Sequence, residues 1–72
     1  MIEALRREIL ETRLSLHRYV CESLELEYEF AATDEARNIL ARRWVAERNA
    51  CYVLQFALDL LKRQQAKDSW NQ

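Results

Sequence analysis

The sequence predicts an all-α fold, a two-helix antiparallel hairpin that pairs with a second copy into a homodimeric four-helix bundle. Three observations predict this fold. The 72 residues include no glycine and no proline, on which tight turns between strands usually depend. Apolar residues recur three and four positions apart over most of the chain, which is the spacing of a helix face. Only residues 31–35 interrupt that spacing, so we expect one bend.

The first helix is predicted over about residues 2–31. Its most regular apolar seam, the first seam, alternates three and four residues apart and is expected to face the second helix. The first seam consists of Ile2, Leu5, Ile9, Thr12, Leu16, Tyr19, Ser23, Leu26 and Phe30. A second seam, about 150° around the helix, consists of Leu10, Leu14, His17, Cys21, Leu24 and Tyr28. One partner helix cannot cover both seams.

The end of the first helix carries a competing pattern. Residues 24–30 alternate apolar and charged, as the residues of a half-buried strand would. The residues on either side keep helical spacing, and no obvious partner strand follows, so we expect helix here as well.

The bend is predicted at about residues 32–33. The hydroxyl of Thr33 is suited to cap the following helix, and Asp34 and Glu35 place negative charge where the helix dipole favours it. The second helix is therefore expected over about residues 34–67, followed by a short polar tail at 68–72. No linker or repeat is visible, so residues 1–72 are predicted to form a single helical-hairpin domain.

The second helix is predicted to carry two apolar seams and a separate aromatic edge. A small-residue seam, which lets another helix approach closely, consists of Ala46, Ala50, Val53, Ala57 and Leu60. A large-residue seam, suited to filling a core, consists of Leu40, Trp44, Cys51, Leu54, Leu58 and Leu61. The aromatic edge lies outside both seams and consists of Val45, Tyr52 and Phe56.

An isolated hairpin would expose more apolar surface than a soluble monomer usually tolerates. Pairing two hairpins covers this surface, and a twofold dimer is the commonest closed assembly. A larger bundle or a different partner chain is the alternative. Because the first seam is assigned to the hairpin contact, the dimer interface is predicted elsewhere. It comprises Leu10, Leu14, Cys21, Leu24, Tyr28, Cys51, Leu54 and Leu58. At this point both parallel and antiparallel arrangements of the dimer stay open.

Folding the chain at the predicted bend sets a register between the helices. Arg18 then lies level with Glu47, so that base faces acid. Cys21 and Cys51 are offset by seven residues, which at ~1.5 Å per residue is ~10 Å and too far for a disulfide. Both cysteines are expected to be reduced and buried.

No catalytic or metal site is predicted. The net charge of −1, from 11 basic and 12 acidic residues, provides no global field toward nucleic acid or membranes. The acidic group on the first helix consists of Glu22, Glu25, Glu27 and Glu29. It lies on a wet face and lacks the histidines of di-iron bundles. His17 stands one turn before Cys21, but no third residue is evident to orient it, so we expect a packed histidine, no cofactor and no enzymatic activity.

Neither a signal peptide nor a membrane span is predicted. The amino terminus mixes acidic with basic residues, and no apolar run follows it. The most apolar stretch, residues 50–61, contains Gln55 and Asp59 and is shorter than the roughly 20 residues of a membrane-spanning helix. We therefore expect a cytoplasmic protein that does not contact membranes.

The remaining surfaces favour a binding protein. Aromatic side chains at edge positions are common anchors of interfaces, and the predicted partner-binding residues are Val45, Tyr52, Phe56 and Trp70. The alternative is that Tyr52 and Phe56 complete the dimer core and Trp70 is a frayed end. We expect a non-enzymatic protein-interaction module, a helical dimer that modulates a larger protein as inhibitor, anti-activator, chaperone or adaptor. The alternative is RNA or DNA binding by a basic patch at the open end of the hairpin. That patch consists of Arg6, Arg7, Lys62, Arg63 and Lys67.

Overall fold

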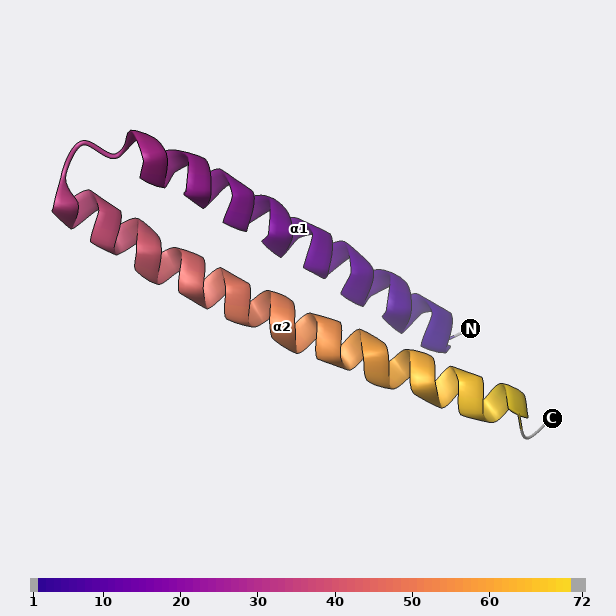
Figure 1. The fold of residues 1–72 in the computed structure, drawn as a ribbon. Coiled ribbons are helices and arrows are strands. Elements are labelled where there is room, and N and C mark those ends of the chain that lie inside the picture. The colour runs from indigo at the N-terminus through magenta and orange to yellow at the C-terminus, as the bar shows by residue number, and fades with distance from the viewer. Residues whose placement is uncertain (1, 71–72) are drawn as a thin grey trace.

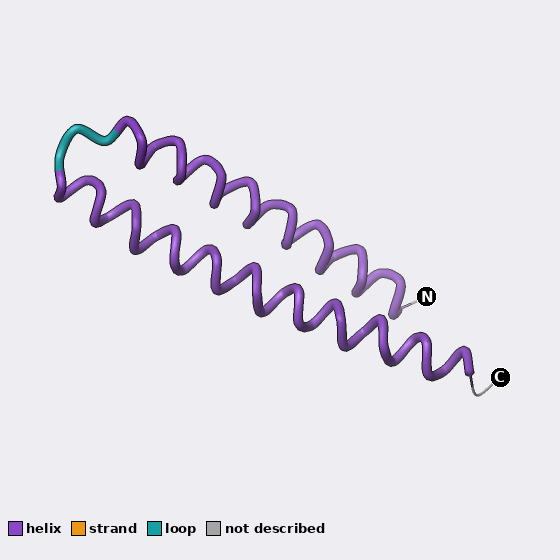
Figure 2. The backbone as a smooth tube through the Cα atoms, in the orientation of Figure 1, coloured by secondary structure: helices purple, strands orange, loops and turns teal. Residues whose placement is uncertain are grey.

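The computed structural model of the protein describes the backbone of residues 2–70 and the side chains of residues 2–67. It contains two helices, α1 (Ile2–Phe30) and α2 (Asp34–Trp70), which run side by side in opposite directions (Figure 1). The fold is a rod of 59 × 15 × 14 Å. Residues 2–70 contain no strand (Figure 2). The all-α hairpin is therefore confirmed, and the strand alternative at residues 24–30 is wrong.

The bend between the helices is held by short backbone and side-chain hydrogen bonds. At the end of α1, the Ala31 amide donates to the Tyr28 carbonyl at 3.3 Å. At the start of α2, the Ala36 amide donates to Oγ1 of Thr33 at 3.1 Å, and the Arg37 amide donates to the Thr33 carbonyl at 3.1 Å. Thr33 is therefore the predicted N-cap of the second helix.

The helix boundaries differ slightly from the predicted ones. α1 ends at Phe30, one residue before the expected end. α2 continues to Trp70, so residues 68–70 of the predicted polar tail are helical in their backbone. Residues 71–72 of that tail lie outside the described residues.

The two helices meet along the second seam of α1 and the large-residue seam of α2. Among the described side chains, the buried apolar ones are Leu14, Leu24 and Leu58, with exposed fractions of 5%, 3% and 2%. Leu14 and Leu24 belong to the second seam, and Leu58 belongs to the large-residue seam. The large apolar side chains of the first seam are exposed. The prediction that the first seam faces α2 is therefore wrong.

Polar contacts across the hairpin explain why the second seam is the buried one. His17, in the middle of that seam, donates from Nδ1 to the carboxylate of Glu47 on α2. Closer to the bend, Nε1 of Trp44 donates to Oε1 of Glu25 at 3.1 Å. Turning α1 to bury the first seam would break both contacts, of which the one between His17 and Glu47 is half-buried and the one between Trp44 and Glu25 is exposed. Spacing alone does not choose between the seams, because both have the same alternation.

The pairing of individual side chains across the hairpin also differs from the predicted one. Arg18, expected level with Glu47, donates from Nη2 to Oε1 of Gln55 at 3.0 Å, while Glu47 bonds to the neighbouring His17. Cys21 and Cys51 lie close together. Both thiols are free and half-buried, and Cys51 is close enough to raise the pKa of Cys21. The predicted separation of ~10 Å between the cysteines is wrong, because side-chain packing sets the register.

Candidate functional site

The first seam forms an exposed apolar strip along the whole of α1. Its large apolar side chains are exposed by fractions that run from 44% at Ile9 to 83% at Phe30, and Leu16 at its centre is 61% exposed. From Ile2 to Phe30 the strip is about 42 Å long at 1.5 Å per residue. A soluble monomer seldom exposes a continuous apolar patch larger than about 300–600 Å². The strip is therefore a candidate surface for another protein chain.

The outward face of α2 carries a second exposed apolar surface. The aromatic edge, with Val45, Tyr52 and Phe56, is 41%, 63% and 64% exposed, respectively. Val53 and Leu60 of the small-residue seam are also exposed. Three of the four residues predicted to bind a partner are thus on the surface. The side chain of the fourth, Trp70, lies outside the described residues.

Tyr52 is linked to the hairpin contact by an arginine that the sequence analysis did not single out. The guanidinium carbon of Arg48 lies 4.8 Å from the ring centroid of Trp44 and 5.7 Å from that of Tyr52. Nε of Arg48 is buried and has no hydrogen-bond partner among the described residues. The stacking therefore holds the guanidinium in place between the two rings. The signal for it was the spacing of four residues from Trp44 to Arg48 and on to Tyr52.

Polar side chains connect the helices along one side of the hairpin. Gln55, which accepts the hydrogen bond from Arg18, donates from Nε2 to Oδ1 of Asp59 at 3.1 Å. The hydrogen bond from Trp44 to Glu25 lies on the same side, because the helix positions of these residues place them on one edge of the contact. These side chains form their hydrogen bonds within the hairpin. The exposed apolar faces lie outside this set of polar contacts.

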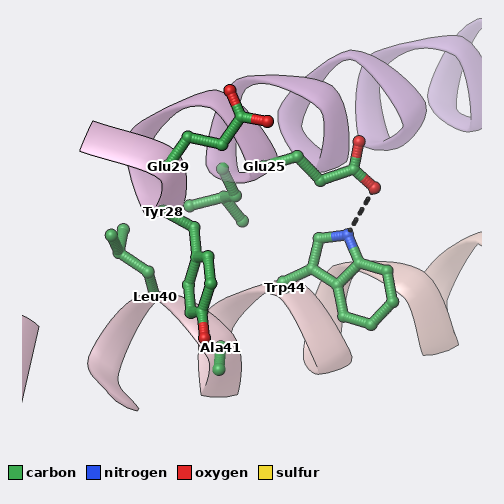
Figure 3. Close-up of a pocket in the computed structure, with 7 residues that line it drawn as sticks. Glu25, Tyr28, Glu29, Leu40, Ala41 and Trp44 are labelled. Atoms are coloured by element: carbon green, nitrogen blue, oxygen red, sulfur yellow. Dashed lines mark hydrogen bonds between the residues drawn. The ribbon is translucent and has the colours of Figure 1, made fainter. Parts of the chain in front are cut away.

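A groove of about 610 Å³ lies near the bend, between the last turns of α1 and the first turns of α2. It is lined by Leu24, Glu25, Tyr28, Glu29, Leu40, Ala41 and Trp44. Figure 3 shows Tyr28 reaching from α1 toward Leu40 and Ala41, while Trp44 reaches from α2 toward Glu25. Aromatic faces and carboxylates both attract cations, so the chemistry of the groove suits a positively charged group.

The residues predicted for a dimer interface lie mostly within the hairpin contact. Leu14, Leu24 and Leu58 are buried by the chain itself. Half-buried in the same contact are Leu10, Cys21, Cys51 and Leu54. Tyr28 lines the groove instead. The reason is that the second seam of α1, rather than the first, packs against α2.

Cys21 is held as a neutral thiol by its surroundings. Burial raises the pKa of Cys21, the adjacent Cys51 raises it further, and Glu47 and Glu25 act in the same direction. A protonated thiol is a poor nucleophile. His17 is engaged with Glu47. This geometry does not activate Cys21.

The basic residues of the predicted nucleic-acid patch lie toward one end of the rod, where the start of α1 and the end of α2 meet (Figure 1). All five are exposed, namely Arg6, Arg7, Lys62, Arg63 and Lys67. Nε of Arg7 donates to Oε1 of Glu11 at 3.0 Å, so its charge is partly neutralised. Binding of RNA or DNA at this end stays a prediction.

Metal-binding groups and membrane-spanning segments are not found in the described part of the chain. No three or more histidine, cysteine, aspartate or glutamate side chains there come together as a metal site would require. Neither described helix has an apolar stretch long enough to cross a membrane. Comparison with protein families, curated proteins and solved structures gives no significant match to this chain.

Proposed function

We propose that the chain is a non-enzymatic protein-interaction module, a small helical dimer that binds and modulates a larger protein. One observation carries this proposal: large apolar side chains are exposed along both helices, outside the hairpin contact. Faces of this kind are typical of helices that pack against another chain or lie in an apolar groove.

The two faces suit different tasks. The first seam is long and mostly aliphatic, with the regular spacing that favours pairing with another helix. The aromatic edge is compact, and its rings are large rigid groups that lose little entropy on binding. The stacking of Arg48 on Tyr52 further restricts this ring before any partner arrives. We therefore assign self-association to α1 and binding of the larger protein to the aromatic edge of α2.

Dimerisation is tested by measuring the absolute mass with light scattering behind a sizing column, over a hundredfold range of concentration. We expect twice the mass of the chain over the upper part of the range. A protein that stays monomeric at every concentration would contradict the dimer.

Binding of a larger protein is tested by capture from the cells that produce the chain, with the double variant Tyr52→Ala and Phe56→Ala. The variant should keep its helicity by circular dichroism and its mass, because both residues are exposed, and it should lose the captured protein. The matched control is Lys62→Ala, an exposed position of α2 away from the aromatic edge, which should capture as the parent does. If the double variant captures normally, the aromatic edge is not the binding surface.

A further inference from the structure

We propose that a second copy of the chain binds along the first seam, with the two α1 helices antiparallel and Leu16 on the twofold axis. The inference rests on the proposed function and specifies the dimer contact within it. The occupant is a second copy because the spacing, the side-chain sizes and the charges of the seam each complement the same seam turned end for end.

The first seam maps onto itself about Leu16 to within one residue. Going outward from Leu16, the intervals between members are four, three, four and three residues toward the amino end and three, four, three and four toward the carboxyl end. An antiparallel copy therefore places a seam residue opposite, or one position from opposite, every seam residue, which suits a twofold interface. The resulting layers are Ile2 with Phe30, Leu5 with Leu26, Ile9 with Ser23, Thr12 with Tyr19, and Leu16 with itself.

The sizes of the side chains favour the antiparallel arrangement over the parallel one. The small members of the seam, Thr12 and Ser23, face the larger Tyr19 and Ile9 of the other copy when the helices are antiparallel. In a parallel pair each residue would face itself, which would stack two serines in one layer and two tyrosines in another. Layers of similar volume pack without cavities or strain. The antiparallel pair therefore fills the interface more evenly.

The charge distribution of α1 favours the same arrangement. Residues 19–30 contain four glutamates and no lysine or arginine, whereas residues 2–18 contain four arginines and three glutamates. A parallel pair would place the two acidic halves side by side. An antiparallel pair places each acidic half beside the amino-terminal half of the other copy, which lowers the repulsion.

One flanking pair makes the arrangement testable. On the edge of the seam, Arg6 and Glu27 are both exposed, and neither forms a hydrogen bond or an ion pair with another described residue. Antiparallel pairing about Leu16 brings Arg6 of one copy level with Glu27 of the partner subunit. Parallel pairing would instead bring Glu27 close to Glu22 of the partner subunit. Reversing the charge at residue 27 thus has opposite effects in the two arrangements.

The extent of the strip is sufficient for a stable contact. Seven large apolar side chains along about 42 Å of helix supply an interface of the usual length for paired helices. Stable interfaces bury about 800 Å² on each partner, so the contact would include the side chains that flank the seam as well as the seam itself.

The first experiment is disulfide cross-linking in a background that carries Cys21→Ala and Cys51→Ala. We expect an equimolar mixture of the Ile9→Cys and Ser23→Cys variants to give a cross-linked dimer on oxidation, and Leu16→Cys to do so alone. Ile9→Cys alone should not cross-link, because the two thiols would lie about 21 Å apart along the axis. Efficient cross-linking of Ile9→Cys with itself would overturn the antiparallel arrangement.

The second experiment leaves both native cysteines in place and covers the case in which their replacement disturbs the fold. Glu27→Arg should weaken the dimer roughly two- to fivefold, as expected for exposed ion pairs, and adding Arg6→Glu should restore it. A stronger dimer with Glu27→Arg alone would favour parallel helices and overturn the proposal.

The two proposals fail in different ways. A dimer with the wrong cross-linking pattern would overturn the arrangement and leave the interaction module in place. A chain that is monomeric at every concentration would overturn the dimer itself, whatever the variants do.

Discussion

Trp44 on α2 donates a hydrogen bond from Nε1 to Oε1 of Glu25 on α1, with 3.1 Å between the two atoms. The bond joins the last turns of α1 to the first turns of α2 and forms one wall of the groove near the bend. Together with the contact between His17 and Glu47, it fixes the rotation of α1 about its own axis. That rotation buries the second seam and exposes the first.

Glu25→Ala should remove this bond and lower the free energy of unfolding by about 0.5–1.5 kcal/mol, at the low end because both groups are near solvent. In a Trp70→Phe background, Trp44 is the single tryptophan, and its emission should change with the variant. Glu29→Ala, at the same groove, is the matched control and should leave both the stability and the emission unchanged. Equal effects of the two variants would contradict a specific bond.

Leu14→Ala and Leu16→Ala should affect the protein in different ways, although the two leucines lie two residues apart on α1. Leu14 is buried, so its truncation leaves a cavity and should lower the free energy of unfolding by about 2–5 kcal/mol. Leu16 is exposed in the hairpin, so its truncation should leave helicity intact and weaken the dimer. Circular dichroism with denaturant and light scattering measure the two effects. Loss of fold in Leu16→Ala at every concentration would mean that the first seam is internal.

Thr33→Ala should lower the free energy of unfolding by about 0.5–2 kcal/mol, because the hydroxyl accepts a hydrogen bond from the Ala36 amide. Thr33→Ser keeps the hydroxyl and should be close to the parent. Urea unfolding followed by circular dichroism compares the three proteins. The same stability in Thr33→Ala as in the parent would rule out an energetic role for the cap.

The alkylation rate of Cys21 should rise at a higher pH than that of a free cysteine. Burial and the nearby Cys51 raise the pKa of Cys21, and only the thiolate reacts. Cys51→Ala should move the rate profile of Cys21 part of the way back toward lower pH, since it removes one cause of the raised pKa. Mass spectrometry after timed exposure to iodoacetamide gives the rate. If the alkylation rate of Cys21 depended on pH as that of a free cysteine does, a raised pKa at Cys21 would be contradicted.

Several local features of this protein were predictable from the sequence because they depend on residues close together in the chain. Helical spacing and the lack of glycine and proline predicted the two helices. Thr33 caps α2 as its hydroxyl and position suggested, because capping involves only the next three residues.

The register between the helices was not predictable from the bend. Counting outward from the bend places Arg18 level with Glu47, whereas Arg18 reaches Gln55 and Glu47 bonds to His17. The buried leucines and the polar contacts beside them determine how far one helix slides along the other. For the same reason Cys21 and Cys51 lie closer together than counting suggested.

The sequence by itself determined that this chain forms two long helices with more apolar surface than one hairpin contact can cover. Only the tertiary structure decided which of the two seams of α1 is internal. Both seams have the spacing of a packed helix face, so their apolar content does not separate them. In the structure the second seam faces α2, and polar partners distant in the sequence meet there, Glu47 with His17 and Trp44 with Glu25.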